Sequence, residues 1–420
     1  MLSTVIDRLT TLGSKYFVIG AFAPVLVFGF LNGVLLYVEF DWFHRWADPQ
    51  ISGTARAFDV AAVAVAVAVV AYVLWSLNAF LIDVLQGRHL RPAGWLSRTL
   101  TAVQLQRFRE LRQGYFQARK TAGEIARSEA RWTEGLSQAA AAGLKESDGV
   151  TDRTTNTYDG ISGNAAAAIA RLRALRTAAQ EIGGGALQAA HDELAAVLRA
   201  NNINVNHPTA GRALAADRTE FLTLIQYAKY QWEAREVALA TELQWRFGPR
   251  DVAPTAFGNV AAALQSYGLT RYGINLPTFW SRLQALLLKE QELFGTLQDA
   301  KAQLDFLVAC CWLTTITTAA WVVVLPFSGS STWRFLATAI AGPIIARACY
   351  VAAVESYVAF GELVRSSVDL HRLRLLEALH VRKPSGLRDE RALWSALRRV
   401  TAYGQETVDI GYHHPPDAQP

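Results

Sequence analysis

The sequence predicts an all-α membrane protein: four transmembrane helices in two hairpins that bracket a large helical cytoplasmic domain. Three observations predict this fold class. Four stretches are apolar enough and long enough to cross a bilayer, only 18% of the 420 residues are charged, and basic residues concentrate outside the apolar stretches. A hydrocarbon core of ~30 Å requires ~20 apolar residues in a helix that rises ~1.5 Å per residue.

The N-terminal membrane hairpin covers 1–83, with spans expected at 17–38 and 60–82. The second span alternates Ala and Val, a period that also suits a strand. Its length favours a helix, because a lone strand cannot satisfy its backbone hydrogen bonds in lipid. The first span is too long for a cleaved signal peptide, so we expect it to be retained. The C-terminal membrane hairpin covers 305–360, with spans expected at 306–327 and 334–358.

Basic residues predict the orientation of the spans. Residues 84–131 hold ten Lys or Arg against three Asp or Glu, and 361–420 hold nine Lys or Arg, whereas the loop between the last two spans has no charge. The positive-inside rule then places both termini and the segment 84–304 in the cytoplasm of a protein in the cytoplasmic (inner) membrane. The aromatic residues expected at the outer interface are Trp42, Phe43, Trp46 and Trp333.

The cytoplasmic segment 84–304 has its own organisation. Apolar residues recur at three- and four-residue steps over 100–142, which predicts a helix. The stretch 138–210 is rich in Ala, Gly and Asn and is interpreted as a peripheral insert. A long helix follows from 213 and ends at the Gly248-Pro249 pair, and a helix from 289 runs into the third span. Residues 361–420 are expected to form a helical extension with a disordered tail.

Two strings carry a resemblance to a known group of proteins. The first is RYG at 271–273 followed by WSRL at 280–283, and the second is GELVRSSVDLHR at 361–372. In these strings the chain resembles an uncharacterised group of bacterial four-span membrane proteins. The resemblance covers roughly 250–400 and, more weakly, the N-terminal hairpin. It implies the four-span architecture, and it supplies no activity, cofactor or catalytic residue.

Charged residues in and after the fourth span are the strongest functional signal. Arg347 and Glu355 fall inside an otherwise apolar stretch, where a charge must face a partner or water rather than lipid. Glu355, Glu362 and Asp369 recur every seven residues, which returns them to nearly the same helix face. Two interpretations remain open for Arg347 and Glu355: a polar, ion-coordinating path, or salt bridges that fix helix packing.

Other polar residues extend this candidate set. Asn32 and Asn78 lie in the first two spans, where an amide more often joins helices than binds a ligand. Asp83 ends the second span and could pair with Arg365, and a charge network beside the membrane is expected. Its members are Asp83, Glu362, Arg365, Asp369 and Arg372. His371 and His380 are expected to be exposed helix residues.

Searches for catalytic signatures return none. The sequence has no phosphate-binding glycine loop, no nucleophile elbow, no His-Glu-x-x-His and no cysteine pair at zinc spacing. We therefore expect no enzyme activity, no cofactor and no metal, and the net charge of +5 is too small to suggest nucleic-acid binding. The expected partners are membrane lipids, other copies of the chain and a cytoplasmic protein. Two functions remain open: an oligomeric channel, transporter or membrane-coupled regulator, or a non-conducting membrane-anchored scaffold. A lipid-acting membrane enzyme ranks last.

Overall fold

The computed structural model describes residues 15–40, 53–90, 94–146, 226, 229–249, 251–328, 332–404 and 410–411. Every regular element in these ranges is a helix, which confirms the predicted all-α class. The expected interface residues Trp42, Phe43 and Trp46, and the insert from residue 147 on, lie outside the described ranges. The chain divides into two compact units, 1–106 with 244–420 and 107–243, which are described separately.

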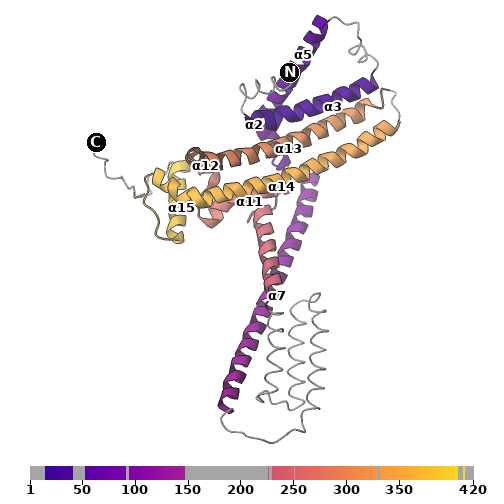
Figure 1. The fold of residues 1–420 in the computed structure, drawn as a ribbon. Coiled ribbons are helices and arrows are strands. Elements are labelled where there is room, and N and C mark those ends of the chain that lie inside the picture. The colour runs from indigo at the N-terminus through magenta and orange to yellow at the C-terminus, as the bar shows by residue number, and fades with distance from the viewer. Residues whose placement is uncertain are drawn as a thin grey trace, which may run out of the picture. The chain divides into compact units, whose positions relative to one another are not determined.

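Four helices are long and apolar enough to cross a membrane by length and composition. These candidate spans are Lys15–Glu39, Ala57–Ser76, Gln291–Val324 and Thr332–Ala378. The last two are the helices α13 and α14, and α14 (Figure 1) continues far beyond the predicted span, to Ala378. The predicted passage of α13 and α14 from apolar into polar sequence without a break is thereby confirmed.

The first two candidate spans are less regular than the sequence suggested. The first consists of α2 (Lys15–Phe17), the π-helix η1 (Val18–Phe22) and α3 (Ala23–Glu39). Pro24 is the second residue of α3, and a proline in a helix removes a backbone donor, so a local change of helix type is expected near it. The second span is α5 (Gly53–Ser76), separated from α6 (Asn78–Leu85) by a turn at Leu77.

Helices α13 and α14 pack against each other along much of their length (Figure 1). Their close approach depends on Gly342, because a Cβ at that position would lie 2.3 Å from side-chain atoms of Thr318. Thr314 and Thr315 donate their hydroxyl hydrogens to the carbonyls of Cys310 and Cys311 in their own helix, as such residues commonly do in membrane helices.

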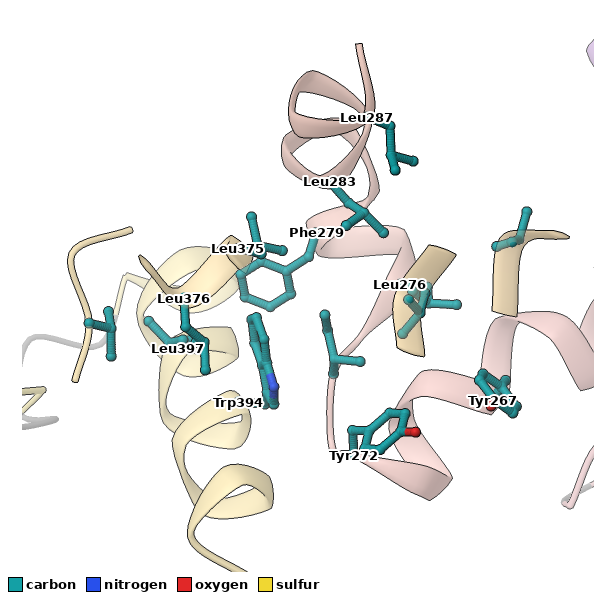
Figure 2. Close-up of a cluster of buried hydrophobic side chains, with 14 of the residues drawn as sticks. Tyr267, Tyr272, Leu276, Phe279, Leu283, Leu287, Leu375, Leu376, Trp394 and Leu397 are labelled. Atoms are coloured by element: carbon teal, nitrogen blue, oxygen red, sulfur yellow. The ribbon is translucent and has the colours of Figure 1, made fainter. Parts of the chain in front are cut away.

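Beyond the apolar part of α14, three further helices enclose its C-terminal half. They are α11 (Ala256–Arg271), α12 (Leu276–Leu287) and α15 (Leu387–Tyr403). Their apolar faces form a core in which Trp394 is fully buried and meets Phe279 edge to face, with ring centroids 5.2 Å apart (Figure 2). Leu375 and Leu376 of α14 complete this core. The RYG string thus lies at the C-terminal end of α11, and the WSRL string lies on α12, and both helices pack on α14.

The second unit contains most of α7 (Trp95–Glu146) and the helix over 229–243. The two helices run antiparallel, because their contacts pair rising residue numbers in α7 with falling residue numbers in the other helix. A Cβ on Gly114 would lie 3.6 Å from Leu239, Arg119 lies 3.9 Å from Glu236, and Lys229 lies 2.8 Å from Glu129. Ala118, Ala122 and Ile125 are buried at the three- and four-residue steps of a coiled-coil seam.

Candidate functional site: the charged stripe of the fourth membrane helix

The charged residues of α14 lie on one continuous helix, as the sequence predicted. We define the charged stripe as Glu355, Glu362, Arg365, Asp369 and Arg372. Residues seven apart on a helix return to within ~20° of each other, so the three acids share a face. Three members of the stripe have a partner on another helix: Glu355 a cation, Asp369 a tyrosine hydroxyl and Arg372 a carboxylate. The fourth, Arg365, lies against aromatic rings. Glu362 is exposed.

Glu355 binds Arg246, which lies at the end of the helix over 229–246. The Arg246 Nη2 donates to both carboxylate oxygens, at 2.9 and 3.0 Å. Residues from Gln244 onward belong to the same compact unit as α14, so this contact lies within one unit. A carboxylate inside an apolar stretch requires such a partner. The residue that the sequence marked as anomalous is therefore an anchor for a second helix.

Arg365 is the most buried cation of the stripe, with 6% of its surface exposed. Its guanidinium lies over the rings of Trp245 and Tyr267, with its central carbon 5.8 and 5.4 Å from the ring centroids. Nη2 donates to the carbonyl of Gln244 at 3.4 Å, whereas Nε and Nη1 have no hydrogen-bond partner among the described residues. Burial lowers the pKa of Arg365 from its usual value, against the opposing effect of Tyr267 and Glu362.

Asp369 is held by tyrosines rather than by a cation. The Tyr267 hydroxyl lies 2.9 and 2.8 Å from the two carboxylate oxygens and donates its one hydrogen to them. Burial raises the pKa of Tyr267 well above its usual value, and the hydrogen bond to Asp369 raises it further. The pKa of Tyr272 is also raised, first by burial and then by a hydrogen bond to Asp369. Burial, and after it the carboxylate of Asp369, thus favour the protonated form of both phenols.

Arg372 connects the stripe to α15. Its Nε donates to Glu390 Oε1 at 2.9 Å, and its guanidinium stacks 3.9 Å from the centroid of the Tyr272 ring. Glu390 is buried, and the Trp394 indole N–H donates to the same carboxylate oxygen at 3.4 Å. This pair is shielded from solvent on both sides, so it fastens α15 to α14 more firmly than an exposed ion pair would.

Two expectations about this region are wrong. Asp83 does not pair with Arg365: it accepts a hydrogen bond from Arg88 Nη1 at 2.9 Å, because the turn after α6 returns that arginine to the end of its own helix. His371 is buried rather than exposed, because it lies on the face of α14 that carries the buried Val364, Val368 and Leu375. Its Nε2 lies 3.3 Å from Glu290. His380 is exposed, as expected.

The two asparagines of the first two spans join helices. Asn32 accepts a hydrogen bond from the Trp321 indole N–H at 2.8 Å and donates to the carbonyl of Phe28 in its own helix. Asn78 donates to Asp305 Oδ1 at 2.9 Å. Both contacts connect the first two spans with α13, and both amides are partly buried. The helix-joining interpretation of these residues fits the contacts.

Arg347 is exposed, and its guanidinium carbon lies 5.4 Å from the centroid of the Tyr350 ring, one turn further along α14. A charged side chain at the centre of a bilayer costs ~2.5–3.5 kcal/mol on insertion scales, and less if it extends toward an interface. The Arg347 side chain lies toward Tyr350. This direction brings its charge nearer to the end of the span at which Glu355 is paired with Arg246.

Sequence reasoning missed two ion pairs that flank the apolar stretches. Asp305 is 3% exposed and accepts a hydrogen bond from Lys301 Nζ at 2.6 Å, in addition to the one from Asn78. Glu39 accepts from Arg334 Nη1 at 3.0 Å. The signal was present, since each acid lies at the edge of an apolar run with a polar sequence beyond it.

The contacts of the charged stripe hold helices together. Among the described residues, no three His, Cys, Asp or Glu side chains are grouped to bind a metal ion. The carboxylates of Glu355, Asp369 and Glu390 each accept hydrogen bonds from the chain itself. Comparisons with protein-family models, curated proteins and solved structures find no match to this chain.

Proposed function

We propose that this chain is a membrane-coupled regulator of the cytoplasmic membrane. In this proposal four helices span the bilayer, and the cytoplasmic coiled coil acts on α14 through the last turn of the helix over 229–246. The observation that carries the proposal is the double attachment of that turn: Arg246 binds Glu355, and Trp245 covers Arg365. Glu355 lies near the end of the apolar part of α14, and Arg365 lies beyond it.

The same contacts weigh against a conduit lined by the charged stripe. A polar path requires ionisable groups that are free to face water, whereas Asp369 and Arg372 are bound to other helices. Glu355 is half-exposed, but its carboxylate is bound by Arg246. A passive scaffold does not require an attachment at this point, because its partner-binding helices need only be tethered. A regulator requires it, since a change in the coiled coil must reach the membrane helix by some rigid contact.

The experiment perturbs the coiled coil and detects the effect on α14. The full chain is reconstituted in liposomes, with its three cysteines replaced by alanine and a spin label placed at the exposed position 340 of α14. Lys229→Glu reverses one charge of the Lys229–Glu129 pair, and the double variant with Glu129→Lys restores the pair as the matched control. If the chain is a regulator, the spectrum of the spin label should change in the Lys229→Glu variant. It should return to that of the unaltered chain in the double variant.

Arg246→Ala then tests the route. With Arg246 present, Lys229→Glu should alter the label at 340, and with Arg246→Ala it should not. An unchanged spectrum in the Lys229→Glu chain would favour a scaffold. Ion flux through the same liposomes that is lost on Glu355→Gln would favour a conduit and overturn the proposal. Extraction of the chain from membranes by alkaline carbonate would overturn the membrane placement itself.

A further inference from the structure

Arg347 is a cation in an apolar helix for which no acidic partner is found in the described part of the chain. Arg347 is exposed, and among the described residues its guanidinium contacts the ring of Tyr350. By contrast, the other charged residues at the ends of this apolar stretch are paired: Arg334 with Glu39, and Glu355 with Arg246. A charge at this depth requires an anion or water, so the partner of Arg347 is to be sought beyond the described residues.

Helix geometry gives the depth of that partner. Arg334 and Glu355 are 21 residues apart, about 31 Å along a helix, which matches the ~30 Å of a hydrocarbon core. Arg347 lies 8 residues from Glu355, about 12 Å. Its side chain extends toward Tyr350, and a long cationic side chain directed this way carries its charge close to the lipid headgroups of the leaflet on the Glu355 side.

Tyr350 supplies a second donor at the same place. Its hydroxyl oxygen accepts a hydrogen bond from the backbone N–H of Phe257 at 3.2 Å. The same hydroxyl carries a hydrogen for which no acceptor is found among the described residues. Phe257 lies in the first turn of α11, whose N-terminal end carries the positive end of the helix dipole. A cation, a free O–H and a positive helix end converge on one surface.

We propose that Arg347 and Tyr350 form a binding site for the phosphate group of a phospholipid in the leaflet on the side of α11, α12 and α15. The guanidinium and the phenol O–H donate to the phosphate oxygens, and the acyl chains lie along the exposed apolar residues of α14, among them Ile344. Lipids with net negative headgroups are favoured over zwitterionic ones, because no headgroup cation competes with Arg347. This inference rests on the proposed membrane placement.

The test measures which lipid remains bound to the full chain. The chain is purified in detergent with added phosphatidylglycerol or phosphatidylcholine, and native mass spectrometry counts the retained lipids. Arg347→Ala should reduce phosphatidylglycerol retention by about tenfold, the loss of one charge-assisted contact, and Tyr350→Phe by about threefold. Arg347→Lys should retain part of the binding. The matched control is Arg388→Ala, an exposed arginine of α15 outside the apolar stretch, which should leave lipid retention unchanged.

Three results would overturn the site. Retention by Arg347→Ala equal to that of the unaltered chain would remove Arg347 from lipid binding. Competition by inorganic phosphate at millimolar concentration would identify a free-anion site instead. A shift in oligomer size in Arg347→Ala without a change in lipid retention would identify a second copy of the chain as the partner. The effect of the coiled coil on α14 through Arg246 is measured separately, by the spin label at position 340. Either proposal can therefore fail while the other stands.

Discussion

Arg246 donates from one guanidinium nitrogen to both carboxylate oxygens of Glu355, and so connects the end of the helix over 229–246 to the candidate span α14. The Glu355 side chain is 54% exposed within the chain, whereas Arg246 is 21% exposed. The pair therefore lies at a surface, where solvent or lipid headgroups moderate its strength. Its importance is positional, because it joins segments more than 100 residues apart.

A double-mutant cycle should measure this pair directly. Arg246→Ala and Glu355→Gln should each destabilise the chain, and the coupling free energy between them should be about 0.5–1 kcal/mol, the range of partly exposed ion pairs. The measurement is denaturant unfolding of the purified chain in detergent. Glu362→Gln, on the same face and exposed, is the control and should show no coupling to Arg246. Coupling indistinguishable from zero would contradict the observed pairing.

Lys301 and Asp305 should respond unequally to truncation. Asp305 is buried and Lys301 is half-exposed. Lys301→Ala leaves a buried carboxylate with Asn78 as its remaining partner, which should cost about 3–5 kcal/mol. Asp305→Asn leaves a lysine that water can solvate, and should cost about 1–2 kcal/mol. Thermal unfolding of both variants checks the order. A larger loss from Asp305→Asn would mean that the carboxylate is not desolvated.

Gly342→Ala should weaken the contact of α13 with α14. The added Cβ would lie 2.3 Å from Thr318, which forces the helices apart and should cost about 1–3 kcal/mol. Adding Thr318→Ala removes the two closest atoms and should recover part of the loss. The comparison of single and double variants by thermal unfolding isolates this contact. Gly295→Ala, whose new Cβ meets nothing within 4 Å, is the control.

Stability should fall at alkaline pH through Tyr267. Its pKa in the folded chain is raised above the unfolded value of ~10, so its contribution is complete below pH ~10 and is lost as the pH rises further. The expected slope is up to about 1.4 kcal/mol per pH unit for each such tyrosine. Asp369→Asn lowers this pKa toward its usual value and should flatten the slope between pH 10 and 11. Tyr403→Phe, at an exposed position, should leave the slope unchanged.

The helices of this chain follow from local sequence, whereas the partners of its charged residues do not. Length and composition predicted the four apolar helices and the continuation of α14, because hydrophobic runs and the seven-residue step are properties of one segment. The pairing of Glu355 with Arg246 depends on where a helix more than 100 residues away ends. Arg246 appeared in the sequence only as part of a helix-terminating RFGP.

The errors have the same origin. Asp83 and Arg365 were paired because both were expected near one membrane face, yet Arg88 is five residues from Asp83 and reaches it through a single turn. Asp305 was overlooked because its burial depends on η1, a π-helical turn that brings Gly20 against it, with an ideal Cβ 3.3 Å from the Asp305 Cβ. A change of helix type within an apolar run leaves no clear trace in composition.

Pro343 gives α14 one point at which bending is easy. The proline lies inside the helix and has no N–H, so the carbonyl of Ala339 lacks its usual intrahelical donor. On the C-terminal side of Pro343 the helix is attached to other helices at Glu355, Arg365, Asp369 and Arg372. On its N-terminal side Arg334 is paired with Glu39. A pull applied at the attachments after Pro343 would therefore swing the first quarter of the helix as a lever that turns about the proline.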